Sequence, residues 1–152
     1  MARALAECRT LMRDRGGMSH VVEATEDDSG WTIQFSDPLV TQLKIDYRFT
    51  LLLGSGAQIV LEEPFALERD GRTEVVPSGD APSEVAWALP LFDCRVRSVV
   101  AASSGELRVE FDEGAVVTVA VNPHYENWQV VLPDGEQWVG TPGGGIAHFP
   151  GR

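Results

Sequence analysis

The chain has 152 residues, of which 43% are hydrophobic and 23% are charged, a composition typical of one ordinary globular domain. Its 23 acidic and 12 basic residues give a formal net charge of −11, which disfavours binding to a nucleic-acid backbone because that requires clustered bases. No apolar run approaches the ~18 residues of a membrane span, so we expect neither a nucleic-acid nor a membrane partner. The 15 glycines and 9 prolines favour a turn-rich β protein.

The N-terminal segment differs from the rest because residues 1–17 carry four arginines against two carboxylates. Apolar spacing predicts a short helix over residues 3–13 that ends at Gly16 and Gly17. We expect residues 1–22 to be an N-terminal extension, either a loosely attached helix or a segment upstream of a true start at Met18. Residues 23–30 are polar and acidic and are predicted to be a linker into a single β-rich domain over residues 23–152.

The first half of this domain shows strand alternation. Apolar residues alternate with polar ones over residues 31–35 and, most clearly, over residues 43–53. A turn at residues 54–56 leads into a partner strand over residues 57–65, in which Pro64 is expected at an edge or at the strand end. Residues 66–82 are predicted to be a loop or a hairpin tip.

The second half begins with a predicted helix over residues 83–92, limited by Pro90, and continues as a meander. Its strands are predicted over residues 95–102, 106–112, 115–121, 128–132, 136–141 and 146–149. The fold class is therefore α+β: a twisted antiparallel sheet or partly open barrel of about eight strands with one short helix.

No motif in the chain predicts catalysis, a metal site or a cofactor. Residues 143–145 form a glycine run that lacks the flanking residues of a phosphate loop and is typical of a turn. The three histidines lack the spacing of zinc ligands, and no serine lies in a nucleophile elbow. The distant cysteines Cys8 and Cys94 favour a reduced, cytoplasmic protein without a disulfide. These observations lean against an enzyme.

Six residues are the candidates for binding a partner or ligand. Asp46 and Arg48 share the polar face of a predicted strand, where they pair or line a groove, and His124 carries the side chain that titrates nearest neutrality. The remaining candidates are an adjacent carboxylate pair and the tryptophan expected to be the most exposed: Glu62, Glu63 and Trp138.

Three functions remain open. The first is a non-catalytic binding module that covers a basic protein with its acidic surface. The second is a small-molecule-binding protein or enzyme with a pocket in the meander, formed by Asp46, Arg48 and His124. The third is a structural or oligomerising module that uses an exposed edge at residues 146–149.

Two stretches resemble a known family. One is L-K-I-D-Y-R-F-T-L-L-L followed by a glycine turn and a strand that ends in E-P-F. The other is Y-E-N-W-Q-V-V-L-P-D-G-E-Q-W-V-G-T-P-G-G-G-I-A-H-F. The residues that carry the resemblance best are Tyr125, Trp128, Pro133, Gly135, Pro142, Gly143 and Gly144. Over residues 43–149 the chain resembles small actinobacterial proteins grouped as a domain of unknown function, which implies no catalytic residue. In type, it is also similar to immunity proteins of bacterial toxin systems.

Overall fold

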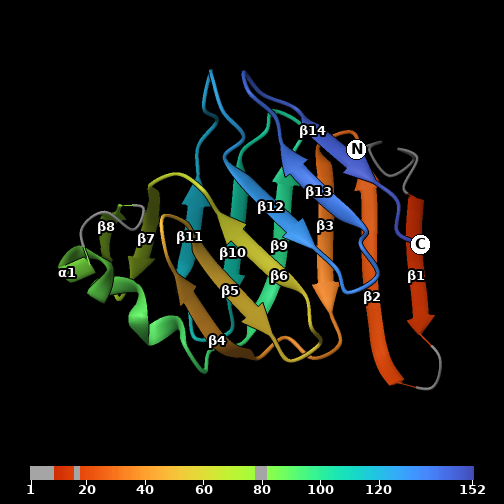
Figure 1. Ribbon diagram of the computed structural model, residues 1–152, viewed down its shortest axis with the longest axis horizontal. Coiled ribbons are helices and arrows are strands. Elements are labelled where there is room, and N and C mark those ends of the chain that lie inside the picture. The colour runs from red at the N-terminus through yellow and green to blue at the C-terminus, as the bar shows by residue number, and fades with distance from the viewer. Residues whose placement is uncertain (1–8, 16–17, 78–81) are drawn as a thin grey trace.

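The strands of the protein form two antiparallel sheets that stack face to face. The computed structural model describes residues 9–15, 18–77 and 82–152. The eight-stranded sheet contains β1 (Arg9–Arg15), β2 (Met18–Asp27), β3 (Gly30–Phe35), β7 (Phe65–Arg69), β8 (Arg72–Val76), β9 (Val96–Ala102), β10 (Leu107–Phe111) and β11 (Val116–Val119). The six-stranded sheet contains β4 (Val40–Ile45), β5 (Phe49–Leu53), β6 (Gln58–Leu61), β12 (Trp128–Val131), β13 (Gln137–Gly140) and β14 (Ile146–Phe149). Their orders are β1-β2-β3-β9-β10-β11-β7-β8 and β14-β13-β12-β6-β5-β4, and the smaller sheet lies in front in Figure 1.

The predicted antiparallel β architecture with one short helix is confirmed, but the expectation of about eight strands is too low. The additional strands are β1 and β2 near the N-terminus, the two strands into which a turn divides the segment 43–53, and the hairpin strands within the segment 66–82. The segment 43–53 turns at Asp46, whose amide donates to the Arg48 carbonyl at 3.0 Å and whose Oδ1 accepts from the Arg48 amide at 2.7 Å. The segment 66–82 contains the hairpin of β7 and β8.

The helix and the linker predicted near the N-terminus are wrong where they can be compared with the structure. Residues 3–8 of the predicted helix lie outside the described residues, but Arg9–Arg15 is a strand that pairs with β2. The predicted linker belongs mostly to β2, which pairs with β1 on one side and β3 on the other. Buried Val22 and Ala24 flank exposed Glu23, so the acidic Glu23 occupies an outward position of the strand.

The helix is shorter than predicted. It consists of one α-helical turn, α1 (Pro82–Val85), followed by a 3₁₀ segment, η2 (Ala86–Leu91), that contains Pro90. Ala88 and Leu91 are buried, so this segment closes the sandwich beside β8. Proline interrupts the α-helical hydrogen-bond ladder and thereby favours the short 3₁₀ form.

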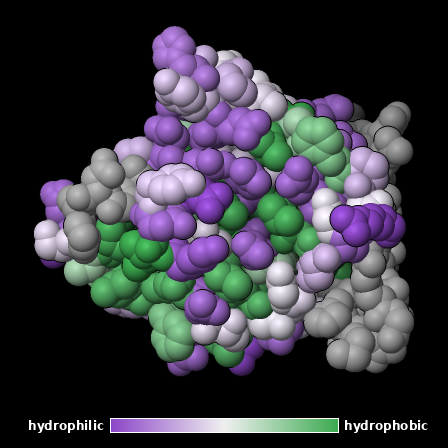
Figure 2. Space-filling view, viewed as in Figure 1, coloured by the Kyte–Doolittle hydropathy of each residue, from purple (hydrophilic) through white to green (hydrophobic). Residues whose placement is uncertain are grey.

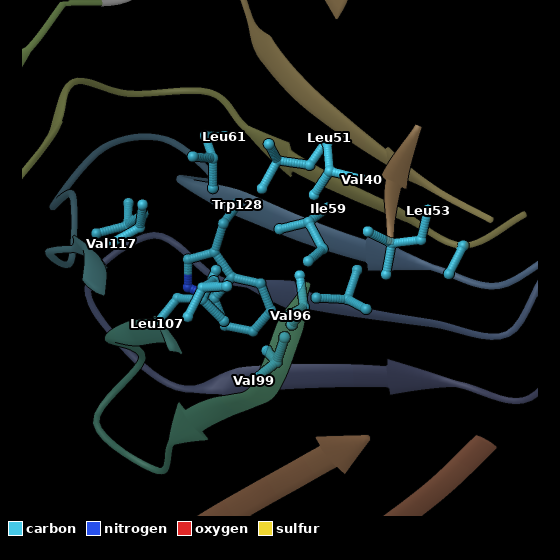
Figure 3. Packing of buried hydrophobic residues seen from close by; sticks show 14 of the residues in the cluster. Val40, Leu51, Leu53, Ile59, Leu61, Val96, Val99, Leu107, Val117 and Trp128 are labelled. Atoms are coloured by element: carbon cyan, nitrogen blue, oxygen red, sulfur yellow. The ribbon is translucent and has the colours of Figure 1, made fainter. Parts of the chain in front are cut away.

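The core fills the space between the sheets. Trp128 comes from the smaller sheet and is fully buried, and Figure 3 shows its ring between Leu61 and Ile59 on one side and Leu107 and Val99 on the other. Its Nε1 donates to the carbonyl of Gly105 at 2.8 Å, so the indole is satisfied without water. The space around Trp128 is therefore occupied by side chains from both sheets.

One turn type recurs in five hairpins. In each, a strand-end carbonyl accepts from the amide of a glycine three residues later, and the amide of that same strand-end residue donates to the carbonyl four residues later. The glycines have φ of 93°, 105°, 100°, 93° and 112° and are Gly56, Gly105, Gly114, Gly135 and Gly144. This is a three-residue loop with a glycine bulge, in which positive φ favours glycine.

Candidate functional site

The loops at one end of the sandwich are held together by backbone hydrogen bonds. The register of the smaller sheet aligns Ile45, Phe49, Leu61 and Trp128, so the segments that follow or precede them lie at the same end of that sheet. The Ser103 amide donates to the Ser29 carbonyl at 2.8 Å, the Gly145 amide to Ser104 at 3.1 Å, and the Gly143 amide to Asn122 at 2.8 Å. We call these segments the loop end. They are residues 27–30, 46–48, 62–63, 103–106, 121–127 and 141–145.

The loop end is acidic. It contains seven carboxylates and one guanidinium, that of Arg48, which gives a formal charge of −6 with histidine neutral (−7 + 1). The carboxylates belong to Asp27, Asp28, Asp46, Glu62, Glu63, Glu106 and Glu126. Arg48 is already engaged, because its Nε lies 3.8 Å from Asp46 Oδ1 and its guanidinium lies 5.3 Å from the Tyr47 ring centre. The remaining surface of the loop end therefore presents negative charge.

The loop between β11 and β12 projects from the sheets and is locally constrained. Asn122 Oδ1 accepts from the amides of His124 at 2.7 Å and Tyr125 at 3.0 Å, and Asn127 Nδ2 donates to the Ala120 carbonyl at 2.6 Å. Figure 1 shows this loop beside the β13–β14 loop above the sheets. The Tyr125 side chain is 66% exposed, and its ring lies 6.3 Å from the His124 ring. A large aromatic side chain is thus displayed on a backbone held by side-chain hydrogen bonds.

The glycine run at residues 143–145 lies in a turn, as predicted, and this turn packs closely against the turn that contains Gly105. A Cβ on Gly105 would lie 2.8 Å from the Gly145 nitrogen and 3.0 Å from the Gly144 Cα. A Cβ on Gly144 would lie 2.9 Å from the Ser104 carbonyl oxygen. The two turns therefore approach each other at distances that side chains prevent.

The structure brings five of the six sequence candidates to the loop end. Asp46 and Arg48 do pair, but in a turn and not along a central strand. The Glu62 amide donates to the Asn127 carbonyl at 3.0 Å, and its Oε2 accepts from Gln129 Nε2 at 2.6 Å. Glu63 follows it and His124 is exposed on the projecting loop.

Trp138 is the exception, because it is fully buried and not partly exposed as predicted. Its neighbour in the adjacent strand explains the burial: His148 is paired with Trp138 in register and stacks on it at 4.9 Å with an interplanar angle of 13°. Trp31 packs edge-on against Trp138 at 5.5 Å. Among the described residues, the Trp138 Nε1 has no hydrogen-bond partner.

Sequence reasoning missed a carboxylate–imidazole pair beside these rings. His148 Nε2 lies 2.8 Å from Glu136 Oε2, and the Glu136 side chain is only 2% exposed. The alternation of β13 puts Glu136 and Trp138 on one face, and a hairpin at the glycine run puts His148 opposite Trp138. That pattern was readable from the sequence. The pair holds the edge strand β14 against the core.

A second cluster lies beside the β7–β8 hairpin. The guanidinium of Arg69 lies 4.1 Å from the Trp87 ring centre and that of Arg72 lies 4.8 Å from it, while Trp87 Nε1 donates to the Leu67 carbonyl. An open groove of about 540 Å³ borders this cluster and is lined also by Glu74 and Glu84. Arg72 pairs with Glu74. The two arginines, Arg69 and Arg72, and the two glutamates, Glu74 and Glu84, together carry no net charge at this groove.

A second open groove, of about 560 Å³, lies at the opposite end of the smaller sheet around Pro133 and Arg152. Neither groove is lined by Asp46, Arg48 or His124, which the pocket hypothesis required. Within the described ranges, no three His, Cys, Asp or Glu side chains are grouped in a way that could hold a metal ion. No helix in the same residues is long and apolar enough to cross a membrane.

Cys94 is a free thiol at the other end of the sandwich, and Cys8 lies outside the described residues. Burial raises the pKa of the Cys94 thiol, and the neighbouring Glu113 carboxylate raises it further. The Sγ donates to the Pro90 carbonyl at 3.2 Å. A thiol in this environment is poorly activated as a nucleophile.

Comparison with known proteins identifies a family. We found no match to the chain among curated proteins or among solved structures. A family model described as a family of unknown function (DUF6188) matches residues 19–150. This match begins well before the resemblance at residues 43–149, and it includes β2 and β3. Because the match covers most of the chain, the protein belongs to the DUF6188 family of unknown function.

Proposed function

We propose that this protein is a non-catalytic protein-binding module whose loop end receives a basic partner. The observation that carries the proposal is the composition of that end: seven carboxylates and a single arginine, which is itself paired with Asp46. A concentrated negative surface attracts a positively charged protein and orients it during encounter.

The projecting loop supplies the second element of a binding surface. Tyrosine is enriched at energetically important interface positions because it contributes a large area at a low cost in conformational entropy. Tyr125 is exposed, while Asn122 constrains the backbone around it by accepting hydrogen bonds from the Tyr125 amide at its Oδ1 and from the Gly143 amide at its carbonyl. A constrained loop loses little further freedom on binding, so more of its contact energy is available for affinity.

The test is capture of partners from a lysate of the source organism by two variants of equal charge. The loop-end variant removes four carboxylates and consists of Asp28→Asn, Glu63→Gln, Glu106→Gln and Glu126→Gln. The control variant removes four exposed carboxylates elsewhere and consists of Glu23→Gln, Glu68→Gln, Glu84→Gln and Glu113→Gln. Both variants should retain the wild-type circular dichroism spectrum.

We expect the wild type and the control to retain the same basic protein in a salt-sensitive manner, and the loop-end variant to lose it. Equal retention by both variants, or equal loss, would contradict the assignment to the loop end. An immunity-type role is the most specific form of the proposal. It predicts a toxin gene beside this gene, and it predicts that co-expression of the wild type, but not of the loop-end variant, rescues cells that express the toxin.

A further inference from the structure

The outward face of the six-stranded sheet is almost free of charge. The register places alternate residues of each strand on this face, opposite to the core residues. Val60 and Val139 lie on it and are buried, yet neither belongs to the core cluster. We call this surface the amide face. Its members are Gln42, Lys44, Thr50, Leu52, Gln58, Val60, Gln129, Val131, Gln137, Val139, Ala147 and Phe149.

The amide face differs from the rest of this acidic protein. Its only charged member is Lys44, which lies on the edge strand β4. The Glu62 carboxylate contacts the face at its border, where it accepts a hydrogen bond from Gln129 at 2.6 Å. The outward face of the eight-stranded sheet, by contrast, carries Glu23, Glu68 and the ion pair of Arg108 with Glu110. Figure 2 looks onto the amide face and shows hydrophilic and apolar residues interleaved across it.

The chemistry of this face is complementary to itself. A glutamine amide both donates and accepts hydrogen bonds without charge, so Gln42, Gln58 and Gln137 can pair with the same three residues on an identical surface. The fourth glutamine, Gln129, already donates to Glu62. Apolar Leu52, Val131 and Phe149 supply contacts between them, and the Phe149 side chain is 48% exposed. A twofold interface needs this self-complementarity, because each surface meets its own copy.

Electrostatics also favours a second copy of this chain as the partner of the amide face. Two copies of a chain with net charge −11 repel each other wherever carboxylates face carboxylates. The amide face is a surface on which two copies can meet without that repulsion. We infer that the amide face packs against the amide face of a second copy about a twofold axis, as the sheets of a sandwich do. The loop end lies at the strand ends and adjoins the amide face at Glu62, so its projecting loops stay outside this contact.

The size of the face determines the expected affinity. Six strands spaced ~4.8 Å apart, each contributing ~4 residues of ~3.3 Å, cover roughly 400 Å² of flat sheet per copy. A standard stable interface buries about 800 Å² per partner, so the dimer belongs to the weak, reversible class. It should therefore be populated only at high protein concentration.

Sedimentation equilibrium of the full chain tests this inference with two matched substitutions. Gln58→Glu places a carboxylate on central strand β6 of the amide face, whereas Gln34→Glu places one on exposed β3 of the other sheet. Concentrations should extend from roughly 10 µM to roughly 1 mM, where weak association is measurable. We expect the wild type and Gln34→Glu to dimerise with the same Kd, and Gln58→Glu to raise it by at least about tenfold through like-charge repulsion.

A second amide-face variant, Gln137→Glu on β13, provides an independent test in case Gln58→Glu disturbs folding. Thermal unfolding should show that each variant is folded before its Kd is interpreted. A wild type that remains monomeric throughout the concentration range overturns the inference. A dimer that neither amide-face substitution weakens, or that Gln34→Glu weakens equally, also overturns it.

Discussion

Replacing Gly105 with alanine should destabilise the protein far more than the same change at Gly114. Both glycines end identical turns: the Gly105 amide donates to the Ala102 carbonyl at 2.7 Å, and the Gly114 amide to the Phe111 carbonyl at 3.0 Å. Their φ values, 105° and 100°, are nearly equal. Their surroundings differ, because no atom lies within 4 Å of a Cβ built on Gly114, whereas Gly105 faces the Gly143–Gly145 turn.

The magnitude follows from these distances. A positive φ costs alanine ~1–2 kcal/mol, and this cost is the same for Gly105→Ala and Gly114→Ala. A Cβ on Gly105 would lie 2.8 Å from the Gly145 nitrogen, which is 0.6 Å short of the 3.4 Å at which ordinary contact begins (3.4 − 2.8). Separating the turns by that amount lengthens the 3.1 Å hydrogen bond from Gly145 to Ser104 to about 3.7 Å, beyond hydrogen-bond range. With the lost packing, we expect Gly105→Ala to cost roughly 1–3 kcal/mol more than Gly114→Ala.

Urea unfolding followed by tryptophan fluorescence measures the difference. The signal is suitable because Trp128 donates to the Gly105 carbonyl and reports directly on this region. The two variants should have equal m-values, so the midpoints convert to free energies on one scale. Equal destabilisation by the two substitutions would refute the argument that the glycine run is needed for close approach.

Two further predictions concern titratable side chains, His148 and Cys94. His148→Phe keeps an aromatic ring against Trp138 but removes the imidazole that contacts buried Glu136 at 2.8 Å, so we expect a loss of ~1–3 kcal/mol in urea unfolding. The same substitution at exposed His124 should change stability by less than about 0.5 kcal/mol, and an equal effect would contradict the role of the pair. Because its pKa is raised, Cys94 should hold less thiolate than a free cysteine at pH 8 to 9 and should react slowly with iodoacetamide when the other cysteine is serine. Glu113→Gln should lower that pKa and speed alkylation, and an unchanged rate would contradict the assigned cause.

Local alternation and glycine turns were sufficient to predict most of the strands. The turn at residues 54–56, the helix near Ser83 and the meander after Val96 all appear close to their predicted positions. These elements depend on neighbours in sequence, which periodicity reads directly. The segment 43–53 shows why such a prediction fails locally. An Asx turn at Asp46 interrupts its alternation, and the side-chain hydrogen bond that forms this turn cannot be detected from the pattern of apolar residues.

The assembly of two sheets could not be predicted in the same way. β3 pairs with β9 and β6 pairs with β12, and the sequence contains nothing that selects these distant partners. The acidic stretch at Glu23 became a strand because it gained partners on both sides, which outweighed its composition. Trp138 was misplaced for the same reason, since its cover comes from Trp31 on the other sheet.

The sequence singled out five residues that lie at the loop end, but it predicted neither the other residues of that end nor its form. His124 and the Glu62–Glu63 pair were chosen for their chemistry, and register alone later brought them to one end. The constraint on Tyr125 came from Asn122, which no motif singled out. Surfaces assembled from several turns become visible only after strand order is known.

The pairing of β6 with β12 has a consequence for how the protein is made. Synthesis proceeds from the N-terminus, so β4, β5 and β6 leave the ribosome long before β12. Until then, the β6 edge, with its apolar Ile59 and Leu61, has open hydrogen-bonding groups that another chain can occupy. A nascent chain stopped before Trp128 therefore exposes an unpaired strand edge, and the smaller sheet is completed and protected only when β12 emerges and pairs with β6.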